Sequence, residues 1–293
     1  MPEYALALGT FDGLHLGHKA VLENIIKKGL TPIALTFNTP PKSGENPNLI
    51  MSSNEKIERL KALGIRSEIM DFEKVKDTSP EDFLSFIQKE YSPKIITTGY
   101  NFRFGKGAAG DTEMLGKFCK ANGIKYVCTN AVLKDGKPVS STRIRELISN
   151  GNVKKAGEML GGYFSFSGVV GHGDERGRTI GFPTVNIPYP NSLVTPKFGV
   201  YASITKYRGE LLKSVTDIGI RPTFETDYVI SETNIINFNN DIYGKKVRIY
   251  LVDFIRDETK FAGINDLQRA IAVDKEIAVA LLDSFLNFVG KNN

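Results

Sequence analysis

Apolar residues in the first half of the chain recur in two alternating patterns. Short apolar runs occupy residues 4–8, 31–37, 67–72, 94–98 and 125–129, and each is typical of a buried strand. Between them, residues 19–28, 52–64, 79–87 and 111–121 repeat apolar positions at helical spacing. This alternation of strand and helix predicts a doubly wound parallel sheet, an α/β fold.

The second half has a different pattern. Residues 163–170, 199–207, 211–218, 233–238 and 247–255 are rich in Val, Ile, Tyr and Phe, and short turns separate them. No helical pattern intervenes, so these strands predict an antiparallel β-barrel or sandwich. A C-terminal helix is expected over residues 265–288, to pack on the barrel. A short helix and linker at residues 151–162 lead us to expect domains at 1–157 and 158–293.

Composition and charge narrow the choice of function without deciding it. The chain has 293 residues, enough for two domains, and a net charge of +5. This mild, diffuse basicity suits anionic small substrates and gives no basis for nucleic-acid binding. Cys119 and Cys128 lack metal or redox spacing, as expected of a reduced cytoplasmic protein. We see no signal-peptide pattern and no apolar run near the roughly 18 residues that a membrane span needs.

The most informative stretch joins the first expected strand to the first expected helix. It reads Gly9-Thr10-Phe11-Asp12-Gly13-Leu14-His15-Leu16-Gly17-His18. A helix N-terminus presents unpaired N–H groups and a partial positive charge, and glycines let the backbone approach a ligand. His15 and His18 are three apart, so both can face one side, where they suit nucleotide phosphates. A glycine turn with two solvated histidines is the alternative, but two of the chain's three histidines fall here.

This stretch resembles the H-x-G-H signature of nucleotidylyltransferases. Its fuller form, G-x-F-D-G-x-H-x-G-H, is similar to the variant in bacterial FAD synthetases. The resemblance implies a Rossmann-like nucleotidylyltransferase domain. It also implies catalytic roles for His15 and His18 and nucleotide contacts from Gly9, Phe11, Asp12 and Gly17.

A second glycine-rich segment, residues 99–110, follows the fourth expected strand. It contains a literal G-x-G-x-x-G at residues 105–110, but a dinucleotide fingerprint opens the helix directly after the first strand of its unit, so we do not assign one. We expect a phosphate- or ribose-facing loop with Asn101 and Arg103 as polar contacts; a surface loop over two buried phenylalanines is the alternative. The segment resembles the F-R-F-G segment of FAD synthetases, which implies that Asn101 contacts the nucleotide phosphates.

A third motif reads Val139-Ser140-Ser141-Thr142-Arg143-Ile144-Arg145. A Ser or Thr here is a natural N-cap for the helix that follows. Two arginines in the first turn oppose the helix dipole, which makes sense if an anion binds there. The stretch resembles the S-S-T-x-I-R motif of the same enzymes. The resemblance implies that Ser141, Thr142 and Arg145 hold the triphosphate and that Arg143 takes the free position.

The chemistry of the second half concentrates in residues 171–186, a Gly- and Arg-rich loop that leads into a strand. Glycines permit backbone donation to a polyphosphate, and arginines neutralise its charge. Thr184 and Asn186 share one face of the strand, where a hydroxyl and an amide can serve Mg²⁺. A basic hairpin loop with a structural Thr is the alternative. The stretch resembles the G-R-x-x-G-x-P-T-x-N motif of riboflavin kinases, which implies nucleotide or Mg²⁺ contacts from Gly177, Arg178, Gly181, Thr184 and Asn186.

A kinase that acts on a primary alcohol needs a base near the hydroxyl. The candidate is Glu232, although a lone carboxylate in a strand is by itself more often a solvated edge residue. Residues 235–238 and 243–245 resemble the strand and turn that follow the glutamate of riboflavin kinases, which implies that Glu232 is the general base. Residues 256–261 also resemble these kinases, and we assign them no chemical role.

In order, the motifs resemble the bifunctional bacterial riboflavin kinase/FAD synthetase family over nearly the whole chain. The resemblance implies that riboflavin and ATP give FMN in the barrel, and that FMN and ATP give FAD and pyrophosphate in the α/β domain. ATP is then a co-substrate and Mg²⁺ the metal. The partners are flavins and adenine nucleotides, with neither nucleic acid nor membrane.

Two positions depart from the family pattern. The run Asn38-Thr39-Pro40-Pro41 lacks a histidine that the family commonly carries, and Asn234 stands where a histidine often follows the base. Two other hypotheses stay open. One is an enzyme with a single live activity and a second domain that only binds flavin. The other is a transferase whose basic barrel binds nucleic acid.

Overall fold

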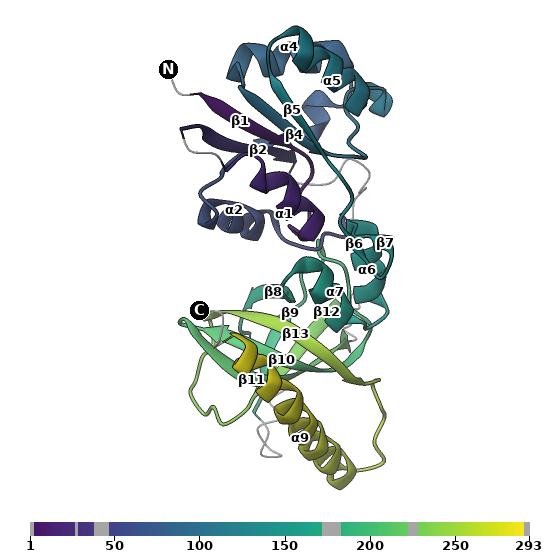
Figure 1. Ribbon diagram of the computed structural model, residues 1–293. Helices are drawn as coiled ribbons and strands as arrows, with labels where there is room; N and C mark the ends of the chain where they lie inside the picture. Colours follow the sequence, from purple (N-terminus) through teal and green to yellow (C-terminus); the bar gives the residue numbers. More distant parts are fainter. Residues whose placement is uncertain (1–2, 27–28, 38–46, 172–182, 222–227, 290–293) are drawn as a thin grey trace. The chain divides into compact units, whose positions relative to one another are not determined.

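The computed structural model describes residues 3–26, 29–37, 47–171, 183–221 and 228–289, with no account of the side chains of 284–289. The chain divides into two compact units, Met1–Arg143 and Ile144–Asn293 (Figure 1). Each unit has its own sheet and its own buried core.

The first unit is built on a five-stranded parallel sheet in the order β3-β2-β1-β4-β5. The strands are β1 (Tyr4–Leu8), β2 (Thr31–Phe37), β3 (Arg66–Met70), β4 (Ile95–Gly99) and β5 (Lys125–Thr129). The strand order reverses beside β1, so the carboxyl ends of β1 and β4 flank the crevice where open α/β sheets bind ligands. The predicted doubly wound sheet is confirmed.

Helices cover both faces of this sheet (Figure 1). On one face, α1 (Leu16–Glu23) and α2 (Ser53–Ala62) bury Leu22 and Leu60 against the alanines of β1. On the other, α4 (Pro80–Tyr91) and α5 (Thr112–Ala121) bury Leu84 and Leu115 with the leucines of β1. Alternate residues of one strand therefore serve two cores, as expected of a sheet that is buried on both sides.

The side chains before these helices fix where each one begins. Ser52, Ser79 and Asp111 each accept an N–H from the first turn of α2, α4 and α5. His15 caps α1 in the same way, so that helix begins at Leu16, before the expected residue 19. The expected strand over residues 67–72 is wrong at its end, because Asp71 caps a short helix, α3 (Phe72–Val75).

The first unit ends in a small hairpin. Its strands are β6 (Leu133–Lys134) and β7 (Lys137–Pro138). Earlier in the chain, the loop after β4 contains a one-turn 3-10 helix, η1 (Lys106–Ala108). The next helix, α6 (Ser141–Ser149), spans the division between the units. Its cap is Ser140, whose hydroxyl accepts the Arg143 N–H at 3.3 Å.

The second unit is a six-stranded antiparallel sheet in the order β8-β13-β10-β11-β12-β9. Its strands are β8 (Phe164–Val169), β9 (Val185–Pro188), β10 (Gly199–Tyr207), β11 (Glu210–Arg221), β12 (Tyr228–Ile235) and β13 (Lys246–Arg256). The expected strand over 233–238 is misplaced. Asn237 has φ of 58°, so the extended chain ends at Ile235.

The antiparallel sheet curls until its two edges meet. Just beyond β8, Gly171 forms an antiparallel bridge with Asn186 of β9, and its N–H donates to the Asn186 carbonyl at 2.8 Å. The edges also approach at Gly168, where an added Cβ would lie only 2.2 Å from the Ile187 side chain. This contact confirms the predicted antiparallel, barrel-like fold.

Hydroxyl side chains line part of one face of this sheet. Ser203, Thr216, Thr233 and Ser231 form a continuous chain of hydrogen bonds across β10, β11 and β12, at 2.7, 2.8 and 3.3 Å. All four side chains are completely buried. We call this set the hydroxyl ladder.

The opposite face of the sheet is covered by α9 (Ile264–Val289), the predicted C-terminal helix. Ala278 and Leu282 pack there against Val200, Ala202 and Ile204 of β10. A shorter helix, α7 (Val153–Leu160), ends at Gly161, whose φ of 60° forms the C-cap.

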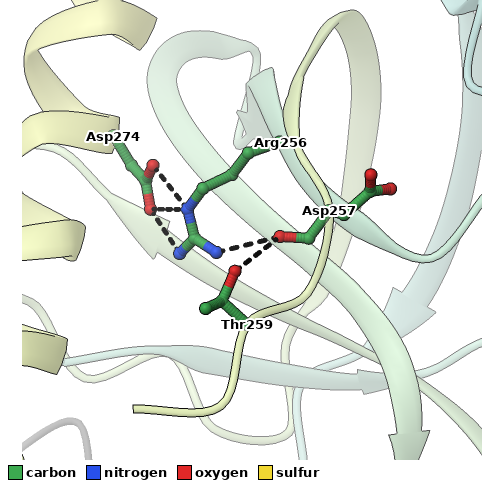
Figure 2. Close-up of polar contacts among 4 residues, drawn as sticks. All are labelled: Arg256, Asp257, Thr259 and Asp274. Carbon is green, nitrogen blue, oxygen red and sulfur yellow. Dashed lines mark hydrogen bonds and ion pairs between the residues drawn. The ribbon is translucent and has the colours of Figure 1, made fainter.

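An ion pair holds α9 to the end of β13 (Figure 2). The Arg256 guanidinium donates to both carboxylate oxygens of Asp274, with Nε–Oδ1 at 2.9 Å and Nη2–Oδ2 at 2.8 Å. Its Nη1 also donates to the Asp257 carbonyl at 3.0 Å. The Asp274 side chain is 4% exposed. Arg256 is the first residue of the 256–261 segment, to which we assigned no chemical role. Its bonds to Asp274 give it a structural role.

Candidate active sites

The turn after β1 forms a compact histidine site at the end of the parallel sheet. The rings of His15 and His18 stack with centroids 3.6 Å apart and planes 14° apart. His15 Nδ1 accepts the backbone N–H of His18 at 3.2 Å. Because Nδ1 is the acceptor, a neutral His15 carries its proton on Nε2. The two imidazoles thus lie together at the N-terminus of α1, as the spacing predicts.

The backbone of this turn is strained. Phe11 and Leu14 have φ of 49° and 44°, a region that residues with side chains rarely adopt. Gly13 has φ of 83°, and a Cβ there would lie 2.9 Å from the Ile50 side chain. Only glycine fits this position. Strained backbone clusters at functional sites, where the surrounding contacts hold it in place.

Asp12 ties the turn to the rest of the site. Its carboxylate is 3% exposed and accepts the backbone N–H groups of Ile50 and Met51 at 3.0 and 3.3 Å. Its carbonyl accepts the Ser141 hydroxyl at 3.1 Å. Two of the predicted motifs, separated by more than a hundred residues, therefore meet in space.

The electrostatics of this site favour a neutral His18. Burial lowers the pKa of His18 well below its usual value, and the positive charges of His15 and Lys56 lower it further. His18 Nδ1 is buried and has no hydrogen-bond partner among the described residues. A buried donor or acceptor without a partner is costly, and a ligand can satisfy it.

The remaining predicted residues of the N-terminal half lie in the histidine turn and α1, in the turn after β4 and in α6. Gly9 directly follows β1, and Gly17 is in the first turn of α1 with the His15 ring 3.2 Å from its Cβ position. Asn101 is exposed in the turn after β4, and Thr142 is exposed in the first turn of α6. Arg145 falls past the division between the units.

Packing explains two of the glycines in the segment after β4. A Cβ at Gly105 would lie 2.7 Å from Pro80, and one at Gly110 would lie 2.6 Å from the Phe104 ring. Arg103 pairs with Asp111 at 3.5 Å, and both side chains are exposed. These glycines permit close packing, and the segment does not open a helix directly after the first strand.

Sequence reasoning missed an aromatic pocket in the first unit. A cavity of about 350 Å³ lies at the carboxyl ends of β1 to β4. It includes Gly9 and Arg103 and is lined mainly by Phe37, Met70, Phe72, Phe83, Phe102 and Phe104. The five phenylalanines come from a strand, two helices and a loop, so they leave no local sequence signal. The topology alone brings them together.

The candidate site of the second unit is a row of polar side chains across neighbouring strands. Asn186 of β9 is directly opposite Glu232 of β12, and Glu232 is directly opposite Asp217 of β11. Directly opposite residues point to the same face of a sheet. Glu232 is 42% exposed and lies 3.7 Å from Arg221. The register thus unites two predicted residues and adds Asp217, which sequence reasoning missed.

Three oxygens on this face of the sheet have no hydrogen-bond partner among the described residues. They are the Oδ1 atoms of Asn186, Asp217 and Asn234, all of them buried. Burial raises the pKa of Asp217 to about 6, and the carboxylates of Glu258 and Glu232 raise it as well. Acceptors without donors beside carboxylates favour binding of a proton donor or a cation.

A pocket of about 260 Å³ adjoins this row. Thr184 and Asn186 line it together with Pro183, Phe238, Asp241 and Tyr243. At the edge of this pocket, Asn234 Nδ2 donates a hydrogen bond to the Pro183 carbonyl at 2.7 Å. The predicted Gly177, Arg178 and Gly181 lie outside the described residues, as does the Pro-rich run at residues 38–41.

Comparison with known proteins agrees with both halves of the chain. Residues 1–143 match the family model of FAD synthetase, and residues 160–282 match that of riboflavin kinase. A bifunctional riboflavin kinase/FMN adenylyltransferase of Bacillus subtilis is 34% identical over 292 residues, covering 94% of this chain and 91% of the relative. The chain belongs to this family. It is therefore an enzyme with riboflavin kinase and FMN adenylyltransferase activities.

Other relatives extend the match. The riboflavin kinase/FMN adenylyltransferase of Escherichia coli K12 is 33% identical over 282 residues, covering 92% of this chain and 90% of the relative. A crystal structure from Streptococcus pneumoniae, described as a macrolide-efflux protein, has a TM-score of 0.86 at 31% identity, covering 95% and 94% of the two chains. Among the helices that the structure describes, we find none with the length and apolar character of a membrane span.

Proposed function

We propose that the histidine turn of the first unit carries adenylyl transfer and that the polar row of the second unit carries riboflavin phosphorylation. The stacked His15–His18 pair at a capped helix N-terminus is the observation that supports the first assignment most directly. For the second unit, support comes from Glu232 lying directly opposite Asn186. The alternative of a single live activity would leave one of these sites without turnover.

In adenylyl transfer the protein mainly has to position the reacting groups and offset the charge of the phosphates. The phosphate of FMN is already an anion at neutral pH, so no general base is needed. His15, through Nε2, and His18 would donate to the phosphates of ATP, while Gly9, Phe11, Asp12 and Gly17 shape the turn beneath them. Asn101, Ser141, Thr142 and Arg145 would offset charge on the α-phosphate and the leaving pyrophosphate.

The aromatic pocket is the natural place for the flavin of this reaction. A flavin ring system is flat and largely apolar, and offset stacking on phenylalanine rings suits it. The pocket includes Gly9, the residue that begins the histidine turn. A flavin there would bring its phosphate toward the histidines.

Riboflavin phosphorylation needs a base, because a ribityl hydroxyl is barely acidic. We assign Glu232 this role: its carboxylate would accept the hydroxyl proton as the oxygen attacks the γ-phosphate of ATP, whose bond to the bridging oxygen breaks to release ADP. Gly177, Arg178 and Gly181, which lie outside the described residues, would bind the phosphates. Arg221, at 3.7 Å, holds the Glu232 carboxylate on the face of Asn186.

The residues at the pocket edge fit a magnesium ion. The Asn186 Oδ1 is buried without a partner among the described residues, and Thr184 lines the same pocket. Amide and hydroxyl oxygens are hard donors of the kind that Mg²⁺ prefers. We propose that Thr184 and Asn186 hold this ion, which when bound neutralises phosphate charge in the kinase reaction.

We further propose that the functional domains are residues 1–157 and 158–293. The kinase family model begins at residue 160, close to the Gly161 cap of α7. A cytoplasmic location and small-molecule partners without nucleic acid complete the proposal. Cys119 and Cys128 are free, as suits a reducing compartment.

A time course tests the whole proposal. The purified protein is given riboflavin, excess ATP and Mg²⁺, and the flavins are separated by chromatography. FMN that rises first and is then converted to FAD is the expected result. FMN without FAD, even when FMN is supplied directly, would contradict the first-unit assignment. Unchanged riboflavin would contradict the second.

A further inference from the structure

A buried lysine lies directly behind the histidine turn. Lys56 of α2 is only 4% exposed. Its Nζ donates to the Thr10 carbonyl at 3.1 Å, the Thr36 hydroxyl at 3.2 Å and the Phe37 carbonyl at 2.5 Å. An ammonium group has three N–H donors, so every donor of Lys56 is used within the protein.

These three acceptors belong to two neighbouring strand ends. Thr10 is in the turn just after β1, and Thr36 and Phe37 end β2. The Thr36 hydroxyl also donates to the Thr10 carbonyl at 2.8 Å, which closes the cluster. Lys56 therefore ties the chain that leads to His15 to Phe37, which lines the aromatic pocket.

We propose that Lys56 is a positioning residue of adenylyl transfer, which fixes the histidine turn relative to the aromatic pocket and places a positive charge behind it. This inference rests on the proposed adenylyl-transfer site. Lys56 does not reach the nucleotide, because its donors are already occupied. It acts on the reaction through the backbone of Thr10 and Phe37 and through its charge.

Stability alone does not account for this lysine. Burial lowers the pKa of Lys56 to about 8, although the nearby Asp12 carboxylate raises it. A lowered lysine pKa means that the charged form is disfavoured in the folded protein, so at neutral pH the ammonium weakens folding. A well-packed apolar side chain of similar shape is often as stable as a buried charge or more so. The charge is therefore better explained by the site that it faces.

Among the described residues, two titratable groups on elements near Lys56 interact with its charge. They are Asp12 in the turn, whose charge raises the pKa of Lys56, and His18 in α1, whose pKa the Lys56 charge lowers. A positioning role through charge therefore has its own signature. Loss of the ammonium should raise the pKa of His18 while the fold is kept.

The test compares Lys56→Met with Lys61→Met in the full-length protein. Met keeps the length of the side chain and removes the charge, and Lys61 is an exposed residue of the same helix. We measure kcat and KM for adenylyl transfer to FMN, riboflavin phosphorylation as an internal control, and the pKa of His18 by NMR. For Lys56→Met we expect kcat of adenylyl transfer to fall about 10²-fold, as for a reacting group displaced by roughly 1 Å. The KM for FMN should change less, and the pKa of His18 should rise.

A folded Lys56→Met protein with adenylyl transfer within twofold of Lys61→Met would overturn the proposal, and so would a fall in kcat without a rise in the pKa of His18. If Lys56→Met prevents folding of the first unit, Thr36→Val decides, because it removes one partner and keeps the lysine. A folded Thr36→Val protein with lower adenylyl-transfer kcat supports the proposal, and an unchanged kcat overturns it. The His18→Ala variant distinguishes failure of the Lys56 inference from failure of the proposed adenylyl-transfer site. If it leaves adenylyl transfer intact, the site assignment itself is wrong.

Discussion

The two units gather their functional residues in different ways. In the first unit, loops that follow parallel strands converge on one sheet end, so Asp12 and Ser141 meet although they are far apart in sequence. In the second unit, antiparallel register sets Asn186, Glu232 and Asp217 side by side on adjacent strands. A parallel sheet thus concentrates loops, whereas an antiparallel sheet aligns side chains. Changes confined to one unit should therefore affect one reaction and spare the other.

The largest effect that would sharpen this contrast is expected at Glu232. Glu232→Gln keeps the shape of the side chain and removes the proposed base, so riboflavin phosphorylation should fall about 10²–10⁴-fold. Conversion of supplied FMN to FAD should be unchanged. Glu210→Gln, at an exposed position of β11, is the matched control. Phosphorylation at the wild-type rate in Glu232→Gln would show that the base lies elsewhere.

The reciprocal change is in the first unit. His18→Ala removes one ring of the stacked pair, and loss of one preorganised donor should slow adenylyl transfer about 10²–10³-fold. FMN formation from riboflavin should proceed normally. Both rates are measured on the same preparation by chromatography of the flavins. An equal loss of both activities would break the comparison, because it would mean that the two reactions share a site.

A third change tests whether the second unit can be weakened alone. Asp274→Ala leaves Arg256 without its carboxylate partner, and the free energy of unfolding of that unit should fall by about 2 kcal/mol. This is less than for a fully enclosed pair, because the Arg256 side chain is 28% exposed. Thermal unfolding, monitored through the remaining kinase activity, measures this loss of stability. Asp266→Ala, which removes an exposed partner of Arg269, is the control and should change little.

The smallest effect concerns pH and Asp217. Its folded pKa of about 6 lies above the unfolded value near 3.8, so the folded protein binds more protons between these values. The stability contribution of Asp217 is therefore lost as the pH rises through this window. Asp217→Asn should raise the free energy of unfolding by about 1–2 kcal/mol at pH 7 and give no gain at pH 4. Denaturant melts at both pH values check this, and an equal effect at both would rule out the charge as the cause.

The sequence predicts the first unit well because its signals are local. Alternating patterns locate the strands, and Ser52, Ser79 and Asp111 mark where helices begin. The histidine turn follows directly from its spacing. The aromatic pocket could not be predicted, because its phenylalanines come from separate segments that only the folded sheet unites.

The second unit is harder to predict from sequence, because pairing between distant strands decides its site. The composition predicts antiparallel strands, but the sequence does not show that Asp217 lies opposite Glu232. The boundary of β12 also depends on the left-handed backbone of Asn237; asparagine adopts this region more readily than most residues, but that preference alone does not mark where a strand ends. The sequence does not indicate the burial of Lys56 for a related reason. On an amphipathic helix it has the sequence context of a solvent-facing lysine, and only the tertiary fold buries it.

The hydroxyl ladder has a consequence for how the second unit folds. Side chains alternate between the faces of a strand, so a slip of β11 or β12 by one residue would send its hydroxyls to the opposite face. Partners left buried and unmatched would each cost about 1–3 kcal/mol. Apolar side chains would tolerate many misaligned pairings, but a row of hydroxyls is satisfied in one alignment. The ladder thus selects against mispaired intermediates in which these three consecutive strands are out of register.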